Sequence, residues 1–327
     1  MIAPFSESDL LLQLKEEVEK VEAELRHQVG SPIALVDAVG RQTLEAGGKR
    51  LRPAFVSLSA RAISDQYDSA RARRLGACME MIHMATLIHD DVIDHADMRR
   101  GKPTASSIHG NTASILSGDV LLARAMVLLA QDGDLAIIRM VSEAVVEIAE
   151  GEVRELEMRG NFDLSEEEHR RILRMKTASF IQCCCETGAL IAGATAAQRR
   201  ALGEFGHHIG MAFQIVDDLL DYRSDKTGKP KAGDYREGQA TLPLIHLRRT
   251  LSDEELERAS RHFGNGVSDD ELRQISLWME ERGSFASAES AARAEVDRAN
   301  LAVDRLPAGE ARNMLRQIGE FVLSRQS

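Results

Sequence analysis

The stretch Met81–Thr104, which reads MIHMATLIHDDVIDHADMRRGKPT, contains the pattern that decides the fold. Its first half carries apolar residues at helical spacing and leads into three aspartates with the spelling DDxxD. The stretch at 213–222, FQIVDDLLDY, has the same two properties. The aspartates are Asp90, Asp91 and Asp94 in the first motif and Asp217, Asp218 and Asp221 in the second. Two acidic motifs on apolar helices predict a helical protein that binds cations.

The spacing of the outer aspartates favours a metal site over an acidic solvated surface. Residues four apart share one face of a helix, so Asp90 and Asp94 project together, as do Asp217 and Asp221. Neighbouring carboxylates repel each other and destabilise a solvated helix. Mg²⁺ in proteins is commonly held by one or two carboxylates together with water and substrate phosphates. We therefore expect each motif to bind a divalent cation.

The overall composition also favours helices. Hydrophobic residues make up 43% of the 327 residues and aromatic residues only 4%. The chain has 7 prolines, none of them between residues 104 and 229, and helix-forming residues are abundant. We expect an all-α fold, and because no linker or repeat divides the chain, we expect a single domain over residues 1–327.

Hydrophobic spacing predicts helices along nearly the whole chain. They span residues 8–28, 33–46, 53–64, 70–95, 111–131, 135–158, 165–193, 197–222, 241–250, 253–264, 268–282, 284–305 and 308–325. The segment 225–238 is rich in glycine and lysine and is predicted to be a loop.

Charge and cysteine content narrow the partners and the compartment. A net charge of −11 disfavours nucleic acid as a partner. Three of the four cysteines are adjacent at 183–185, which suits neither a disulfide framework nor a zinc site. Together with Cys78 they predict buried thiols in a reducing cytoplasm. The N-terminus lacks a signal-peptide pattern, and no uninterrupted apolar run approaches about 18 residues, so we expect no transmembrane segment.

Basic residues form four islands near the acidic motifs. The segment GGKRLRP at 47–53 is a glycine-rich turn that suits an oxyanion. The islands are Lys49, Arg50 and Arg52; Arg99 and Arg100; Lys176 with Thr177; and Lys226, Lys229 and Lys231. His83 and Gln214 lie on the helical faces of the two motifs. We expect two phosphate sites, one bridged by metal and one held by basic residues alone.

Together these segments resemble the trans-isoprenyl diphosphate synthases. The segments that carry the resemblance are GGKRLRP at 47–53, the Met81–Thr104 stretch, KTAS at 176–179, FQIVDDLLDY and the GKP loop at 228–230. They occur in the family's order over nearly the whole chain. Their sequences are most similar to those of the long-chain octaprenyl and solanesyl synthases. The resemblance implies the all-helical isoprenoid synthase fold, a single bundle around a deep central cavity, and a homodimer.

The resemblance also implies roles for individual residues. Those that match the isopentenyl diphosphate site are Lys49, Arg52, His83 and Arg100. Those that match the allylic diphosphate site are Arg99, Lys176, Thr177, Gln214 and Lys229. Asp90, Asp94 and Asp217 match the metal ligands. The implied catalytic set is these three with Asp91, Asp218, Asp221 and Lys176.

The implied reaction is a prenyl transfer that needs a metal but no protein nucleophile. About three Mg²⁺ ions, for which Mn²⁺ can substitute, would stabilise the diphosphate leaving an allylic substrate such as farnesyl or geranylgeranyl diphosphate. Isopentenyl diphosphate attacks the allylic cation, and the departed diphosphate takes the proton. An apolar cavity would protect the cation from water. The product would serve quinone side chains, and its exit into lipid implies a peripheral membrane contact.

Residues before the first motif indicate the product length. Ala85 and Thr86 are small where short-chain relatives often carry bulky aromatic residues, so we expect an open tunnel. Its floor is expected on the helix at 135–158, near Met140 or Val141. This predicts a product of about six to ten isoprene units, with octaprenyl diphosphate as the best single expectation.

Two positions depart from the family pattern. Ala232 stands where relatives commonly have a glycine, and Gln239 stands where they often have a lysine. Both lie after the GKP loop, so they bear on loop closure and phosphate affinity, while Asp234 is retained.

Other functions fit parts of the sequence. A short-chain geranylgeranyl diphosphate synthase would carry out the same reaction, whereas a non-catalytic partner subunit would be expected to have degraded aspartate motifs. A terpene cyclase would share the acidic motifs but lack GGKRLRP and His83. A di-iron bundle needs Glu-x-x-His pairs, and Glu80–His83 and Glu204–His207 are formal matches. The second match lies near glycines that better suit close helix packing.

Overall fold

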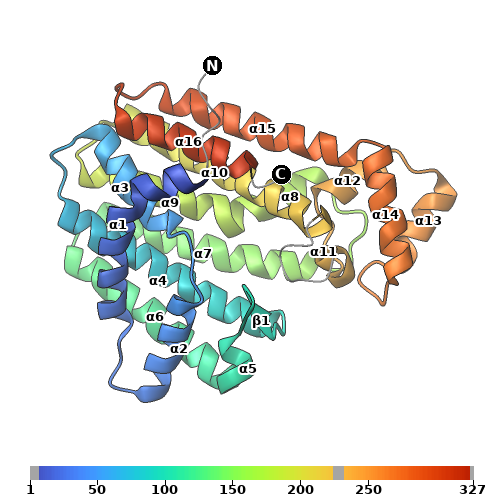
Figure 1. Ribbon diagram of the computed structural model, residues 1–327, viewed down its shortest axis with the longest axis horizontal. Coiled ribbons are helices and arrows are strands. Elements are labelled where there is room, and N and C mark those ends of the chain that lie inside the picture. The colour runs from blue at the N-terminus through green and yellow to red at the C-terminus, as the bar shows by residue number, and fades with distance from the viewer. Residues whose placement is uncertain (1–6, 224–231, 325–327) are drawn as a thin grey trace. The chain divides into compact units, whose positions relative to one another are not determined.

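A computed structural model describes residues 7–223 and 232–324, with side chains from residue 18 onward. Nearly all of these residues are helical, which confirms the all-α prediction (Figure 1). The helices up to the second motif are α1 (Glu7–Val29), α2 (Ala34–Glu45), α3 (Leu51–Ile63), α4 (Ser69–Ile93), α5 (Ala105–His109), α6 (Asn111–Asp132), α7 (Leu135–Met158), α8 (Glu166–Leu173), the π-helix η1 (Arg174–Ala178), α9 (Ser179–Ile191) and α10 (Ala196–Arg223). The later ones are α11 (Gly233–Glu237), α12 (Leu242–Arg248), α13 (Asp253–Arg261), α14 (Asp269–Glu281), α15 (Ser284–Val303) and α16 (Glu310–Ser324). Two short strands, β1 (Met98–Arg99) and β2 (Lys102–Pro103), form an antiparallel hairpin.

The chain divides into two compact units. The first unit contains Met1–Ser142, Cys183–Gly203 and Asp304–Gln317. The second contains Glu143–Gln182, Glu204–Val303 and Ile318–Ser327.

The long helix α4 organises the first unit. It packs against α1, α3, α5 and α6 (Figure 1). Asp68 caps its N-terminus by accepting a hydrogen bond from the backbone N–H of Arg71 at 2.9 Å. Met79, Met81 and Ile82 are buried along the helix. This packing fixes the helix whose end carries the first aspartate motif.

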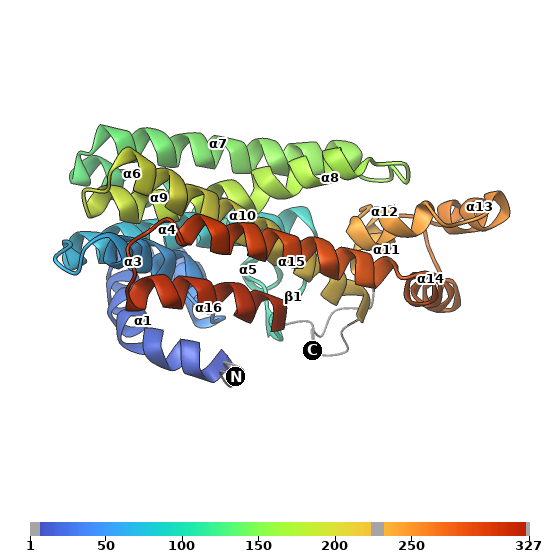
Figure 2. The ribbon, with the colours of Figure 1, turned by 90° about the horizontal axis from the view of Figure 1, so that it is seen from above.

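The second unit is built around α10 and α15 together with the helices at 242–281. Figure 2 shows α12, α13 and α14 gathered near one end of α15, and α12 and α14 both contact α15. Tyr235 and Phe162 both pack edge-on against Phe263, with ring centroids 5.1 and 5.3 Å apart respectively. These aromatic contacts hold α11 against the neighbouring segments.

The four cysteines belong to the core of the first unit, as predicted. Cys78, Cys183, Cys184 and Cys185 are all buried and reduced. Burial raises the pKa of the Cys78 thiol to about 12, so this thiol stays protonated at neutral pH. Packing rather than thiol chemistry explains their positions.

The predicted helix bounds agree with the structure to within a few residues, with three differences. The predicted helix at 165–193 is interrupted by η1, and the short helix α5 was not expected. The predicted loop at 225–238 contains α11, and its residues 225–231 lie outside the described residues. Gly238 follows α11 at φ +77°, a left-handed conformation that ends such short helices.

Among the residues that the structure describes, α6 is the one helix long and apolar enough to cross a membrane by length and composition. No such helix was expected from the sequence. Core helices meet the same criterion, and 39% of the apolar stretch is buried. Arg124 on α6 donates to the carbonyls of Gln28, Val29 and Gly30 at 2.7–3.1 Å, so α6 is tied to the end of α1. These contacts show that α6 packs within the first unit.

Candidate functional site

The first aspartate motif lies at the C-terminal end of α4. Asp90 and Asp91 are in the last turn, and Asp94 is the C-cap residue. The C-terminus of a helix carries a partial negative charge, so carboxylates there are destabilising unless a cation neutralises them. No basic residue lies in this last turn. The motif therefore lowers the stability of the helix end, and a bound cation would offset this loss.

The middle aspartate of the first motif is held inside the protein. Asp91 is only 6% exposed and accepts a hydrogen bond from Nε of Arg99 at 2.6 Å. Arg99 comes from β1, so the hairpin that follows α4 supplies the counter-charge. Asp90 is half-buried and Asp94 is exposed. The outer carboxylates are the more accessible ones.

The second motif, near the end of α10, repeats this arrangement. Asp218 is 6% exposed and lies 2.9 Å from Nε2 of His169, a buried residue on α8. Asp217 and Asp221 are half-buried. In both motifs a buried middle carboxylate has a basic partner, and the outer two are more accessible. The outer carboxylates are thus the ones more accessible to a ligand.

Asp234 extends the acidic cluster of the second motif. Its backbone N–H donates to Oδ2 of Asp221 at 3.0 Å. Burial, together with the nearby carboxylates of Asp221 and Asp218, raises the pKa of Asp234 well above its usual range. The site therefore concentrates negative charge that a divalent cation would relieve.

Basic residues gather around His83 in the first unit. Burial, followed by the positive charges of Arg52 and Arg100, holds the pKa of His83 well below its usual value. His83 is therefore neutral at pH 7 and can donate a single hydrogen bond among cations. Burial also lowers the pKa of Arg52. Arg52 is half-buried and Arg100 is exposed, so these cations, grouped around a neutral donor, can meet an anionic ligand.

Arg50 and Arg100 build the turn beside this cluster. Arg50 is 4% exposed, has a left-handed backbone and donates to Glu80 at 3.1 Å. Arg100 donates to the carbonyl oxygen of Gly47. A Cβ at Gly48 would lie 3.0 Å from a guanidinium nitrogen of each arginine, so both side chains pack closely on this turn. Arg50 is thus part of the framework, while Lys49 beside it is half-buried.

The residues expected at the allylic diphosphate are partly brought together in the second unit. Lys176 and Thr177 lie in η1, and Thr177 Oγ1 donates to Gln214 Oε1 of α10 at 3.2 Å. Lys176 forms ion pairs with Glu152 and with Glu155. Sequence reasoning did not single out either glutamate, although their spacing of three residues places both on one face of a predicted helix.

The remaining predicted positions have simple surroundings. Ala85 and Val141 are buried, and Thr86 donates to the carbonyl of His83 at 2.9 Å. Ala232, one of the two departures from the family pattern, is buried with a left-handed backbone, at φ +52°, where a glycine would be unstrained. Lys229 lies outside the described residues, as do Lys226 and Lys231.

The described residues do not favour the di-iron alternative. They contain no group of three or more His, Cys, Asp or Glu side chains arranged to hold a metal by themselves. Of the two formal Glu-x-x-His matches, Glu80 forms a buried ion pair with Arg50 at 3.1 Å. Pairs of carboxylates that need substrate phosphates to complete a metal site remain consistent with this geometry.

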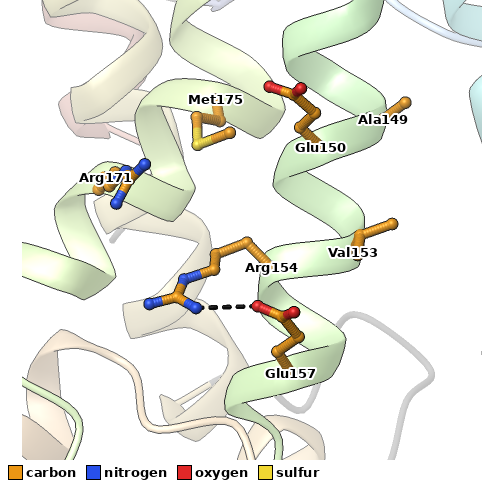
Figure 3. A pocket seen from close by; sticks show the side chains of 7 residues that line it. All are labelled: Ala149, Glu150, Val153, Arg154, Glu157, Arg171 and Met175. Carbon is orange, nitrogen blue, oxygen red and sulfur yellow. Dashed lines mark hydrogen bonds and ion pairs between the residues drawn. The ribbon is translucent and has the colours of Figure 1, made fainter.

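An open pocket of about 480 Å³ lies on α7 beside α8 and η1 (Figure 3). Its lining residues are Ala149, Glu150, Val153, Arg154, Glu157, Arg171 and Met175. Arg154 already donates to Glu157 at 2.8 Å (Figure 3). It also donates to Glu168 at 2.6 Å. None of the predicted site residues lines this pocket.

The sequence matches the family described as Polyprenyl synthetase over residues 33–276. The chain belongs to this family. It is 35% identical to heptaprenyl diphosphate synthase component 2 of Geobacillus stearothermophilus, over 94% of this chain and 96% of that protein. It is also 35% identical to octaprenyl diphosphate synthase of Escherichia coli, over 93% and 94% of the two chains.

Solved structures agree with this assignment of the polyprenyl synthetase fold. The crystal structure of a decaprenyl diphosphate synthase from Rhodobacter capsulatus has a TM-score of 0.92 and 34% identity, covering 98% of this chain and 99% of that one. The polyprenyl synthase from Caulobacter crescentus, complexed with calcium and isoprenyl diphosphate, has a TM-score of 0.93 and 32% identity over both complete chains. This polyprenyl synthetase therefore has the isoprenoid synthase helical fold. It is a prenyltransferase of the long-chain trans-prenyl diphosphate synthase type.

Proposed function

We propose that this polyprenyl synthetase uses Mg²⁺ to condense isopentenyl diphosphate head-to-tail with an allylic diphosphate such as farnesyl or geranylgeranyl diphosphate. The observation that carries the proposal is the repeated arrangement of the two motifs, each with a buried, partnered middle aspartate and more accessible outer ones. The family match crosses both units and supports residues 1–327 acting as one polyprenyl synthase domain.

The aspartates fit the metal by chemistry. Mg²⁺ prefers oxygen ligands, and water and substrate phosphate commonly fill several of its coordination positions. One or two carboxylates from the protein are therefore enough, which the outer aspartates can supply. In the proposal Asp90, Asp94 and Asp217 hold about three ions. When bound, the metal neutralises charge that develops on the departing diphosphate. Asp91, Asp218 and Asp221 support these ligands by position, and they are held by Arg99, His169 and the backbone N–H of Asp234 respectively.

The basic residues bind and orient the two diphosphates. Isopentenyl diphosphate would lie at Lys49, Arg52, His83 and Arg100, where the neutral His83 donates a hydrogen bond among positive charges. The allylic diphosphate would be held by Arg99, Lys176, Thr177, Gln214 and Lys229. Guanidinium groups contact phosphate oxygens in pairs, and ammonium groups act as point charges. Fixing both substrates supplies orientation, so no protein nucleophile is required.

The proposed product is long, in the range of about six to ten isoprene units, with octaprenyl diphosphate as the best single expectation. The small, buried Ala85 supports this, with Thr86 and Val141 as further length-determining positions. Replacing Ala85 with Phe should shorten the product, which chromatography of the hydrolysed prenols would measure. An unchanged product length would contradict the role of Ala85 in leaving the tunnel open.

We further propose a cytoplasmic homodimer whose product serves quinone side chains and leaves through a peripheral membrane contact. The first unit supports a dimer because α5 and α6 expose large apolar side chains. These are Ile108, Ile115, Leu116 and Val127, each 42–58% exposed. Large apolar side chains left exposed on neighbouring helices are a feature of many protein interfaces.

The test is product analysis after incubation with Mg²⁺, labelled isopentenyl diphosphate and farnesyl diphosphate. A ladder that ends at a long all-trans product is expected. A geranylgeranyl product would keep the reaction but replace the long-chain assignment with the short-chain one. No product with several primers would contradict the proposal for the isolated chain. Because one relative is named component 2, the assay would then be repeated with a candidate partner subunit.

A further inference from the structure

Two glutamates of α7 enclose the ammonium group of Lys176. Oε2 of Glu152 lies 3.0 Å from Nζ, and Glu155 accepts a shorter hydrogen bond from the same atom. The three side chains are each 22–24% exposed, so water reaches them only in part. Partly buried ion pairs of this kind hold a flexible lysine in one conformation.

The backbone brings these groups together. Lys176 lies in the π-helix η1, a wider turn that often occurs at functional sites. Gly151 lets η1 approach α7, because a Cβ there would lie 2.8 Å from Cβ of Met175 and 3.0 Å from the backbone N of Lys176. This close approach brings the backbone of Lys176 next to the helix that carries both glutamates.

The geometry leaves part of the ammonium group for a ligand. A lysine ammonium has three N–H donors, and two of them are taken by the glutamates. Burial alone would lower the pKa of Lys176, but the charges of Glu155 and Glu152 outweigh it and raise the pKa, so the group stays charged. The third donor then has one direction fixed by the other two.

We propose that Glu152 and Glu155 are positioning residues that aim Lys176 at the allylic diphosphate. The inference rests on the proposed function. Its physical content is that the two carboxylates fix the lysine before substrate binds, which removes the entropy loss that a mobile lysine would suffer. The carboxylates do not touch the substrate, and they act through Lys176 alone.

The test compares three double variants with the wild type. In Glu152→Ala/Glu155→Ala we expect the KM for farnesyl diphosphate to rise roughly 10- to 100-fold, as when other orienting groups are lost. The KM for isopentenyl diphosphate should stay within about twofold, because that substrate does not use Lys176. Glu152→Gln/Glu155→Gln should recover most of the loss, since amide oxygens still accept hydrogen bonds from the ammonium group.

Glu143→Ala/Glu150→Ala is the matched control, because both of these glutamates are exposed on the same helix. A second readout is calorimetric binding of farnesyl thiolodiphosphate, a slowly ionising analogue, in Mg²⁺. Its Kd should weaken in parallel with the KM, while circular dichroism and the Gln variant show whether the protein folds.

Three results would overturn the inference: an unchanged or lowered KM for farnesyl diphosphate in the Ala variant, equal effects on both substrates, or no recovery by Gln. A different result would contradict the proposed function without bearing on this inference. If the wild type binds the analogue but forms no product, the proposed condensation by the isolated chain fails, and the positioning role is judged by the binding data alone.

Discussion

The two aspartate motifs have the same arrangement but different supports. In the first, Asp91 is held by Arg99, which follows it by only eight residues in the hairpin after α4. In the second, Asp218 is held by His169, which precedes it by 49 residues on another helix. The first motif is therefore supported locally, whereas the second depends on the packing of α8 against α10. Replacing residues in each support should separate these two cases.

The largest effect is expected from the outer carboxylates. Replacing Asp90 or Asp217 with Asn keeps the side-chain shape but removes the negative charge that attracts the metal, so kcat/KM with Mg²⁺ should fall by roughly 10³-fold. Steady-state assays across a Mg²⁺ titration would measure this. Asp90 lies in the last turn of α4, so its removal should also raise the free energy of unfolding by about 0.3–1 kcal/mol, with a smaller gain for Asp217. A parallel loss of stability and activity would show that these carboxylates are structural.

The next effect distinguishes the two supports directly. His169→Leu leaves the buried Asp218 without its partner and should lower the free energy of unfolding by about 2–3 kcal/mol. Arg99→Leu should cost about 1–2 kcal/mol, because the Arg99 side chain is 29% exposed and water can reach the pair. Urea unfolding followed by circular dichroism would give both values. Equal costs would remove the distinction between a local and a packed support.

Close helix packing beside the first motif offers a smaller test. His89 precedes Asp90, and its Nε2 lies 3.2 Å from the carbonyl oxygen of Ile115 on α6. A Cβ at Gly118 would lie 2.8 Å from Cδ2 of His89, so Gly118→Ala should displace the ring at a cost of about 1–3 kcal/mol. Half-maximal activity should then need roughly tenfold more Mg²⁺.

The control for this substitution is Gly309→Ala, where nothing lies within 4 Å of the added methyl group. If Gly118→Ala has the same Mg²⁺ requirement as this control, α6 does not position the first motif.

The smallest effect concerns the stability at low pH of α8, the helix that carries His169 and so supports the second motif. Burial would raise the pKa of Glu166, but hydrogen bonds from Arg170 and Arg249 outweigh it and lower the pKa to about 2. Because the folded pKa lies below the unfolded value of 4.5, the stabilisation is present above about pH 4.5 and is lost as the pH falls toward 2. Glu166 is partly exposed, so we expect only about 1–2 kcal/mol.

Glu166→Gln should therefore reduce stability at pH 7 and flatten its decrease between pH 4.5 and 2. Since Glu166 begins the helix that carries His169, this decrease should affect the second motif. Denaturant unfolding at several pH values measures it, and an unaltered pH profile in the variant would contradict the assignment.

Local patterns explain why much of the fold was predictable. The apolar spacing that predicted a helix at 70–95 matches α4, and the spacing at 135–158 matches α7 in both bounds. The helix α7 buries one face and follows simple periodicity, whereas α4 is buried on every side between Leu75 and Ile82. The π-helix at Lys176 was not predictable in this way, because a single wider turn leaves the spacing nearly unchanged and depends on the contact with Gly151.

The site was predictable where its functional residues are close together in the sequence. The aspartate motifs could be identified from the sequence because each repeats one local spelling. His169 and the glutamates that hold Lys176 could not, since their partners are brought near by packing rather than by sequence separation. Pairing across helices was therefore the part that sequence reasoning missed.

The buried cysteines make the chain well suited to spectroscopic labelling. Thiolates rather than thiols react with maleimides, and all four native thiols are buried, with the pKa of Cys185 raised to about 12. A cysteine introduced at an exposed position such as Glu150 would thus be the single reactive site for a fluorophore or spin label. A probe there would follow the region around η1 during turnover without first removing any native cysteine.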